Sequence, residues 1–274
     1  MSPPRIKLSF GDVLSESFRI FFGNIPAFFH LVTIPWILSL LLRIGGAAVD
    51  DDSLPIVLAE KALDVVPTVM FMVAWMRFVL VGPHKVGRLP GLGWSVRESA
   101  FLVHLLKVGG IAFLLLGGFV LAVGTIDPAM LGGGAPIDPD MARREALAAP
   151  FGTGFMISAL LALRVSFGLA ATAVDIPFAP RQSWAFSRGN GWTIVGLLFI
   201  IFFASAIATM VAALFPLGLA RGLGAYNAAT VIAWTAAILV SYAGAGVAAT
   251  AQAVIFRRLT GWRDGAPSTL EKVA

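Results

Sequence analysis

The sequence contains no cysteine and few charged residues. Without cysteine the chain forms no disulfide, carries no thiolate nucleophile and holds no cysteine-ligated metal or iron–sulfur centre. Charged residues make up 13% of the chain, about half of the ~25% that is usual in soluble domains, and hydrophobic residues make up 58%. This composition leaves too little polar surface to coat a water-soluble globule, so we interpret the chain as an integral membrane protein.

Patterns typical of catalysis or metal binding are also lacking. The three histidines, His30, His84 and His104, are far apart in the sequence, and no paired-carboxylate arrangement accompanies them. The glycine run at 132–134 lacks the Lys-Ser/Thr of a phosphate-binding loop, and the chain has no Gly-x-Ser-x-Gly motif. We therefore expect no catalytic residue, no metal site and no cofactor, and we expect that the protein is not an enzyme.

Six stretches are long and apolar enough to cross the ~30 Å hydrocarbon layer of a membrane, for which a helix needs about 20 residues. They run from Ile25 to Leu42, Val65 to Val81, Leu102 to Gly124, Phe151 to Val174, Thr193 to Pro216 and Ala228 to Phe256. The expected fold is all-α, a polytopic membrane bundle of six transmembrane helices. We expect a single membrane domain over residues 1–274, of which 257–274 form a cytoplasmic tail.

Lysine and arginine gather on one side of these spans. Fourteen of the twenty lie in the N-terminal segment, the second and fourth loops and the tail, five lie on the other side, and Arg164 lies within a span. The acidic residues gather on the opposite side, Glu60 and Asp64 among them. Because loops rich in Lys and Arg stay in the cytoplasm, both termini are expected to be cytoplasmic. The basic residues are spread along the loops, so anionic lipid headgroups account for them and no nucleic-acid partner is expected.

A short segment recurs on the cytoplasmic side of each odd-numbered span. Ser17, Ser99 and Ser183 each follow Glu or Gln, and they are separated by 82 and 84 residues. This spacing predicts three parallel pseudo-repeats, at about 9–81, 94–174 and 180–256. Each is expected to consist of an amphipathic interfacial helix followed by a helix hairpin.

The first copy illustrates the interfacial helix, which we expect from Ser9 to Phe22. Ser9 and Asp12 form a helix-capping pair. The apolar residues that fall on one helical face are Phe10, Leu14, Phe18 and Phe21. This pattern is typical of a helix that lies in the membrane plane. Gly23 is expected to end the helix in the left-handed conformation, and Asn24 is expected to cap the next helix.

Three features of the sequence resemble a known group of proteins. Residues 10–18 read Phe-Gly-Asp-Val-Leu-Ser-Glu-Ser-Phe, Arg164 is followed by Ala-Val-Asp at 173–175, and residues 183–190 read Ser-Trp-Ala-Phe-Ser-Arg-Gly-Asn before a new span. These features resemble the six-span bacterial membrane proteins of the YciC type, which are similar to the membrane domain attached to some glycerophosphoryl diester phosphodiesterases. The resemblance implies a location in the bacterial inner (plasma) membrane. It implies no agreed biochemical activity and carries over no catalytic residue.

Four residues are candidates for a binding site: Arg164, Arg77, Asp175 and His30. Arg164 lies 13 residues into the fourth span, about 20 Å along its axis, where a lone charge is costly unless it is paired or hydrated. We therefore expect Arg164 to face the interior, and the comparable place of Arg77 in the second span favours a structural or lipid-binding role for both. Asp175 follows eleven residues later on nearly the same face, about 16 Å from Arg164 and too far to pair with it directly. His30 is expected to make a satisfied polar contact rather than to relay protons.

The predicted spans carry few other polar residues, so they offer little to line a transport pathway. We favour a non-enzymatic membrane module that binds membrane lipids or a protein partner, and the alternative of a homo-oligomer is left open. The second hypothesis is a small-solute or lipid transporter whose pathway runs past Arg164 along the axis of the repeats.

Overall fold

The computed structural model describes residues 6–49, 54–85, 94–124, 158, 161, 163–164, 166, 168–176, 180–223 and 226–263, and every regular element among them is helical. The long helices are α2 (Ile25–Ala48), α3 (Leu54–Val81), α4 (Val96–Gly124), α8 (Gly191–Leu223) and α9 (Tyr226–Thr260). The short ones are α1 (Phe10–Gly23), η1 (Pro83–Lys85), α6 (Gly168–Ala173) and α7 (Pro180–Phe186). The prediction of an all-α fold is confirmed for this part of the chain.

Five of these helices are long and apolar enough to cross a membrane. The qualifying segments are Ile25–Ala48, Leu58–Val81, Val96–Leu115, Gly191–Gly218 and Ala228–Thr260. They coincide with five of the six predicted spans and indicate a multi-pass membrane protein. The remaining predicted span, from Phe151 to Val174, lies mostly outside the described residues, and α6 is its described end.

Helix α1 begins where the sequence predicts. The hydroxyl of Ser9 accepts a hydrogen bond from the backbone N–H of Asp12 at 3.4 Å. The helix packs against α9. Its buried residues are Val13, Ser17 and Phe21. Phe21 therefore faces the protein, whereas Phe18 and Phe22 are exposed. The position of α1 in the membrane plane remains a prediction.

The turn between α1 and α2 does not have the predicted backbone. Gly23 is not left-handed, and Asn24 donates its side-chain amide to the carbonyl oxygen of Ile20 at 2.7 Å. Asn24 thus closes α1 and makes no side-chain cap for α2. The left-handed glycine occurs in the third copy of the recurring segment, where Gly189 has a φ of 86°.

Two polar contacts tie the N-terminal residues to distant parts of the chain. Asn190 accepts a hydrogen bond from the backbone N–H of Leu8 at 2.9 Å and donates one to the carbonyl oxygen of Ile6 at 2.7 Å. Glu16 on α1 accepts hydrogen bonds from both arginines at 257–258, near the end of α9. The first helix is therefore held by the beginning of α8 and the end of α9.

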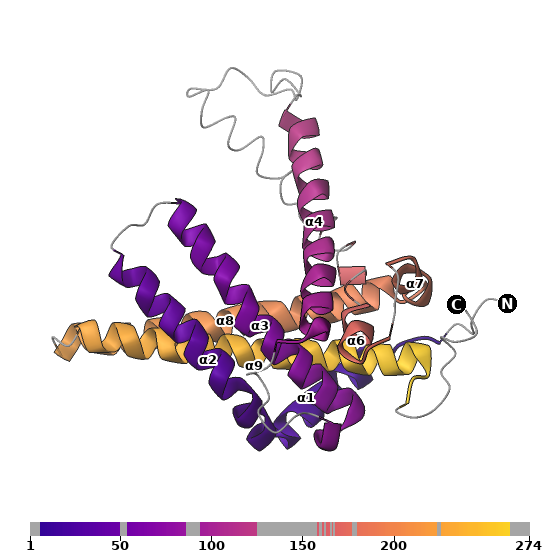
Figure 1. Ribbon diagram of the computed structural model, residues 1–274, viewed down its shortest axis with the longest axis horizontal. Coiled ribbons are helices and arrows are strands. Elements are labelled where there is room, and N and C mark those ends of the chain that lie inside the picture. The colour runs from indigo at the N-terminus through magenta and orange to yellow at the C-terminus, as the bar shows by residue number, and fades with distance from the viewer. Residues whose placement is uncertain are drawn as a thin grey trace.

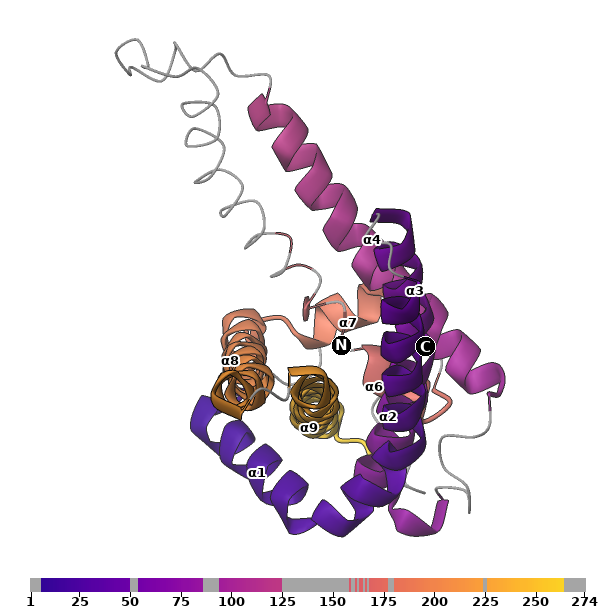
Figure 2. The ribbon, with the colours of Figure 1, turned by 90° about the vertical axis from the view of Figure 1, so that its left-hand side faces the viewer.

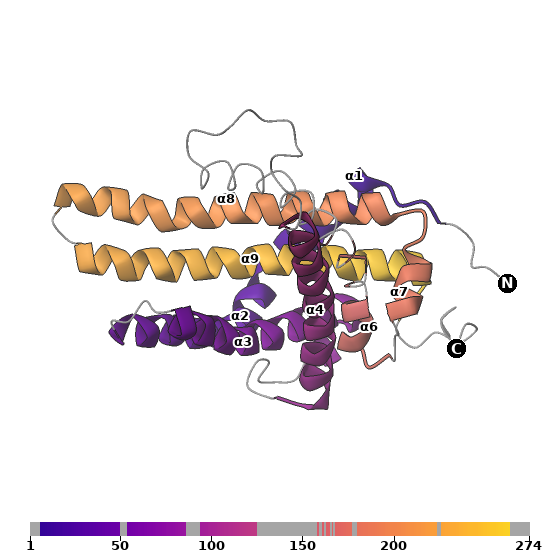
Figure 3. The same cartoon turned by 90° about the horizontal axis from the view of Figure 1, so that it is seen from above.

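Helix α9 lies at the centre of the structure. It packs against α1, α2, α3, α6 and α8, and Figure 3 shows it between α8 and the α2–α3 pair. Much of its buried surface consists of alanines, Ala248, Ala249, Ala251 and Ala253. Such small residues let neighbouring helices approach closely. A cluster of aromatic rings fills the space between α1, α2, α3 and α9, with neighbouring centroids 5.2 to 6.2 Å apart: Phe21, Phe28, Phe71, Trp75 and Tyr242.

The long helices do not all run in one direction. Helices α8 and α9 form an antiparallel hairpin, α2 and α3 pack obliquely along it, and α4 stands across it (Figures 1 and 2). The six-span arrangement remains a prediction, because the structure describes five helices that are long enough to cross a membrane.

A short helix precedes two of the pairs of long helices. In the first and third copies of the recurring segment, a short helix leads through Gly-Asn into a pair of long helices, α1 with α2–α3 and α7 with α8–α9. In the middle copy α4 runs without a break from Val96 to Gly124, so it has no separate interfacial helix. The threefold repeat remains a prediction.

Candidate functional site

Three helix ends meet at a cluster of ion pairs formed by Arg77, Arg97 and Asp175, here called the Asp175 cluster. Arg77, near the end of α3, donates from Nη1 to the carbonyl oxygen of Ala173 at 3.1 Å and to Oδ2 of Asp175 at 3.3 Å. Arg97, at the start of α4, donates from Nε to Oδ1 and from Nη2 to Oδ2 of Asp175, both at 2.7 Å. One carboxylate thus joins α3 and α4 to the end of α6.

The backbone of Asp175 explains its position at the end of α6. Its N–H donates to the carbonyl oxygen of Thr172 at 3.2 Å, and the N–H of Ile176 donates to that of Ala171 at 3.0 Å. These two hydrogen bonds form a Schellman motif, which requires a left-handed residue and usually has glycine there. Asp175 takes that role with a φ of 63°. Aspartate tolerates this conformation, and unlike glycine it supplies a carboxylate to the two arginines.

The electrostatic surroundings of Asp175 favour its ionised form. Hydrogen bonds from Arg97 are the main reason that the pKa of Asp175 is lowered from its ordinary value, partial burial opposes them, and the charges of Arg97 and Arg77 add to the lowering. The Asp175 side chain is 54% exposed, so water screens part of this attraction. With two guanidinium groups and one carboxylate, the Asp175 cluster keeps an excess of positive charge.

The start of α4 is fixed by a Ser-x-x-Glu cap. The backbone N–H of Ser95 donates to Oε2 of Glu98 at 2.9 Å, and the Ser95 hydroxyl contacts the same oxygen. The Ser95 hydroxyl also accepts from the backbone N–H of Arg97 at 3.2 Å. This arrangement satisfies two of the backbone N–H groups that the start of a helix leaves free, those of Ser95 and Arg97. It thereby holds Arg97 where its side chain reaches Asp175.

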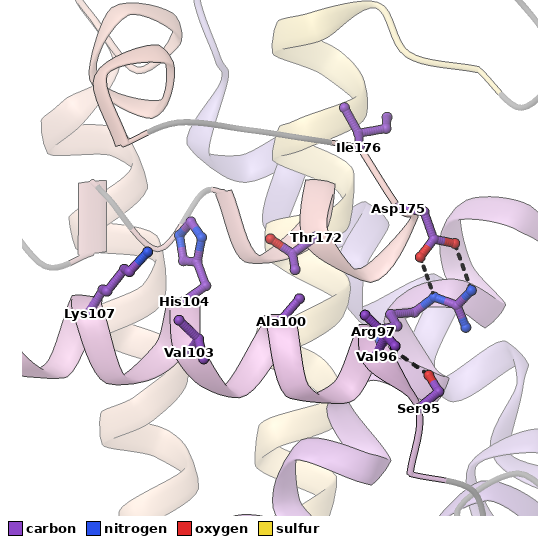
Figure 4. A pocket seen from close by; sticks show the side chains of 10 residues that line it. All are labelled: Ser95, Val96, Arg97, Ala100, Val103, His104, Lys107, Thr172, Asp175 and Ile176. Carbon is purple, nitrogen blue, oxygen red and sulfur yellow. Dashed lines mark hydrogen bonds and ion pairs between the residues drawn. The ribbon is translucent and has the colours of Figure 1, made fainter.

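A pocket of about 700 Å³ runs along α4 beside the Asp175 cluster (Figure 4). Helix α4 lines it with residues three or four positions apart, which share one helical face. These are Ser95, Val96, Arg97, Ala100, Val103, His104 and Lys107, and they face Thr172, Asp175 and Ile176. Arg97 lies at one end, and His104 and Lys107 lie at the other. The pocket therefore offers separated positive charges along a partly apolar wall.

The wall behind His104 is closely packed. A Cβ atom added at Gly168 on α6 would lie 2.6 Å from Cε1 of His104 and 3.0 Å from Oγ of Ser183. Both of these side chains are buried. Gly168 therefore lets α4 and α7 come close to α6, and a larger residue there would push α4 away.

Arg164 lies in a separate contact. Its guanidinium carbon is 3.7 Å from the ring centroid of Trp184, and its Nε donates to Oγ of Ser187 at 3.2 Å. A Cβ atom at Gly191 would lie 3.1 Å from the Arg164 Nε, so glycine makes room for the side chain. These partners all belong to the segment that runs from α7 to the start of α8. A solute that passed Arg164 along a transport pathway would have to displace Trp184 and Ser187 from it. A structural role of Arg164 is already accounted for by these two contacts.

The four predicted binding residues therefore fall in three places. Arg77 and Asp175 contact each other, Arg164 lies against Trp184, and His30 is exposed on α2. Their role in binding remains a prediction. Within the described ranges of the chain, no three His, Cys, Asp or Glu side chains are grouped so that they could hold a metal ion.

The sequence reasoning missed a set of polar contacts between α2, α3 and α9. The Ser39 hydroxyl donates to Oδ1 of Asp64 at 2.5 Å and lies 2.8 Å from the Tyr242 hydroxyl. One turn further along, Arg43 pairs with Glu60 at 3.1 Å. The sequence carries a signal for these contacts. Ser39 and Arg43 on α2 are four residues apart, as are Glu60 and Asp64 on α3, and this spacing places each pair on one face of its helix.

Comparison with known proteins gives no family. No protein-family model, curated protein or solved structure matches the chain. The similarity to YciC-type proteins therefore rests on the short sequence features alone, and a functional assignment depends on the geometry described above.

Proposed function

We propose that the chain is a non-enzymatic module of the bacterial inner membrane, of the YciC type, that binds anionic phospholipids at its cytoplasmic surface. The binding site is the pocket along α4. The bound lipid places its phosphate between Lys107 and the Asp175 cluster and lays its acyl chains along the apolar residues of α4.

The observation that carries this proposal is the combination of positive charge and apolar surface in one pocket. Arg97 and Lys107 line the pocket and Arg77 adjoins it, and together they outnumber the two nearby carboxylates, Asp175 and Glu98, so the pocket attracts an anion. Beside these charges, α4 leaves apolar side chains exposed, among them Val103, which is 48% exposed. A phospholipid has the matching pair of parts, a charged headgroup and an apolar tail.

The position of the pocket along the chain supports the same proposal. The start of α4, which lines the pocket, follows the loop with the largest share of basic residues, and the charge distribution assigns that loop to the cytoplasmic side. Anionic lipids give that membrane surface a negative potential, and each nearby Lys or Arg gains about 1 kcal/mol from it. Lys107 reaches this surface because long basic side chains extend toward the headgroups.

Lipid retention measured by native mass spectrometry tests the proposal. The protein is released from nanodiscs that contain equal amounts of anionic and zwitterionic phospholipid. Lys107→Gln is expected to lower the retained anionic lipid about fivefold relative to wild type, which corresponds to about 1 kcal/mol. Arg19→Gln is the matched control, because Arg19 is an exposed basic residue of α1 outside the pocket lining.

The comparison between the two variants decides the outcome. Equal retention of anionic lipid by wild type, Lys107→Gln and Arg19→Gln would show that this pocket does not bind anionic lipid. A similar loss in both variants would also contradict the proposal, because it would reflect overall charge rather than this site.

A further inference from the structure

Two arginines meet without an acidic partner where α7 leads into α8. Arg188 lies near enough to Arg164 for its charge to act on it. Among the described residues, neither arginine forms an ion pair with Asp or Glu. The sequence explains this, because residues 146–263 include one acidic residue, Asp175, and it is already bound within the Asp175 cluster. The two arginines therefore carry positive charge that no described carboxylate balances.

The start of α8 adds to this positive charge. A Cβ atom at Gly191 would lie 3.1 Å from Nε and 3.4 Å from Cζ of Arg164, so the guanidinium group lies against the first residue of α8. The first N–H groups of a helix have no acceptor within it, and they give this end of the helix a partial positive charge. A second positive charge is unfavourable there, whereas an anion is stabilised. Arg164, Arg188 and the start of α8 thus all favour an anion at the same place.

The guanidinium group of Arg164 is held in a way that leaves hydrogen-bond donors available. Trp184 covers one of its faces at 3.7 Å, and its Nε donates to Ser187 at 3.2 Å. Within the described ranges of the chain, its two Nη groups donate no hydrogen bond. A planar guanidinium group that is fixed by its face and by Nε presents these two groups along its edge. Arginine binds the oxygens of a phosphate or a carboxylate through this edge.

Exposed tryptophans indicate that this place lies at the membrane surface. Trp184 is 43% exposed, and Trp192, in the first turn of α8, is 78% exposed. Indole rings are enriched at the boundary between hydrocarbon and headgroups. The anionic group that is abundant at this boundary is the phosphate of a phospholipid, and unbalanced positive charge favours lipids of net negative charge.

We propose that Arg164 and Arg188 bind the phosphate of an anionic phospholipid at the start of α8. The contacts of Arg164 with Trp184 and Ser187 then orient its guanidinium group toward the lipid. Neither arginine lines the pocket along α4, so this site goes beyond the function proposed above and does not depend on it. The lipid belongs to the cytoplasmic leaflet, because the charge distribution assigns residues 181–188 to that side.

Photolabelling of the full chain in nanodiscs tests the site. An anionic and a zwitterionic phospholipid, each with a diazirine beside its phosphate, are compared at equal amounts, and the labelled peptides are mapped by mass spectrometry. In wild type, the anionic probe is expected to label residues 184–192 about fivefold more than the zwitterionic probe. Arg188→Gln should remove most of this preference, and Arg188→Lys should keep it because the charge remains.

Arg181→Gln is the matched control and should leave the preference unchanged. Arg181 is also an exposed arginine at the start of the third copy of the recurring segment, but its charge does not act on Arg164. Because Arg181 and Arg188 are both exposed, these variants are expected to fold like wild type. Lys107→Gln is also expected to leave the labelling of residues 184–192 unchanged, so failure of this site and failure of the pocket along α4 can be told apart.

Three results would overturn the proposal. The first is equal labelling of residues 184–192 by the two probes in wild type. The second is an equal loss in Arg188→Gln and Arg181→Gln, because it would reflect overall charge rather than this site. The third is suppression of the labelling by inorganic phosphate at constant ionic strength, which would assign the site to a soluble phosphate compound rather than to a lipid.

Discussion

Replacing Gly246 by alanine tests the close contact at the centre of the structure. A Cβ atom at this position of α9 would lie 2.6 Å from Cε2 of Phe21 and 3.4 Å from Cζ of Phe71. Carbon atoms in favourable contact are about 3.5–4.0 Å apart, so the Phe21 ring would have to move by about 1 Å. Phe21 has little freedom to do so, because its ring packs against Phe28 and Trp75 at centroid distances of 5.2 and 5.4 Å.

The size of the effect follows from two opposing contributions. Extra atoms in a well-packed core cost about 1–3 kcal/mol. Alanine in a helix recovers about 0.5–1 kcal/mol relative to glycine. We therefore expect Gly246→Ala to lower the free energy of unfolding by about 0–2.5 kcal/mol. On the scale of soluble domains of 150–250 residues, this lowers the Tm by up to about 10 °C, whereas alanine at a site with free space raises it.

Thermal unfolding in detergent, followed by tryptophan fluorescence, measures this difference. Gly110→Ala is the control, since a Cβ atom there meets nothing within 4 Å, and its Tm is expected to stay the same or to rise. The double variant Gly246→Ala/Phe21→Leu should be more stable than the sum of the two single changes predicts, because leucine lacks the ring atom nearest to the new Cβ. Equal Tm values for Gly246→Ala and Gly110→Ala would refute the contact between α1 and α9.

Three further predictions concern the polar clusters. Asp175→Asn keeps the left-handed turn but removes the charge, so it should lower the free energy of unfolding by about 1 kcal/mol at neutral pH. The pKa of Asp175 is lowered in the folded protein, so the stability difference between wild type and Asp175→Asn is complete above the pKa of the unfolded chain, about 3.9. The stability difference is lost as the pH falls through the pKa of the folded protein. A Tm difference that stays constant on acidification contradicts this prediction. Asp64→Leu should lower the free energy of unfolding, measured in urea, by about 0.6–1.7 kcal/mol. Asp64→Asn should lower it less, because the amide oxygen of asparagine still accepts the hydrogen bond from Ser39. Equal losses of stability in the two variants would argue against this hydrogen bond. Arg164→Ala should lower the yield of folded protein. Arg164→Lys should restore the yield partly, because the ammonium group of lysine is an imperfect substitute for the planar guanidinium group over Trp184. A normal yield of Arg164→Ala would show that the contact with Trp184 is dispensable.

Local features of the fold could be predicted from the sequence. The long helices follow from apolar runs, because a backbone in hydrocarbon must satisfy its own hydrogen bonds and a helix does so within one segment. The start of α1 follows from Ser9 and Asp12, which are three residues apart. The Ser-x-x-Glu cap of α4, at Ser95 and Glu98, is an equally local signal that the sequence reasoning did not use.

Contacts between distant segments could not be predicted in the same way. Arg77 and Arg97 are 98 and 78 residues from Asp175 in the sequence, and any of several basic residues could have paired with it. The buried face of α1 depends on α9, which leaves Phe18 outside although its spacing from Phe21 suits a common face. The direction of α4 depends on its packing against α3 and α6, which the apolar pattern does not specify.

The contact of Glu16 with the arginines at 257–258 has a consequence for the order in which the protein assembles. These partners are separated by more than 240 residues, and α9 is the last long helix among the residues that the structure describes. During synthesis α2 and α3 emerge before α9, so Phe21 already has Phe28 and Trp75 to pack against. Glu16 meets its two arginines only after the end of α9 has been made. Helix α1 is therefore fixed in two steps, first against the α2–α3 pair and later by α9.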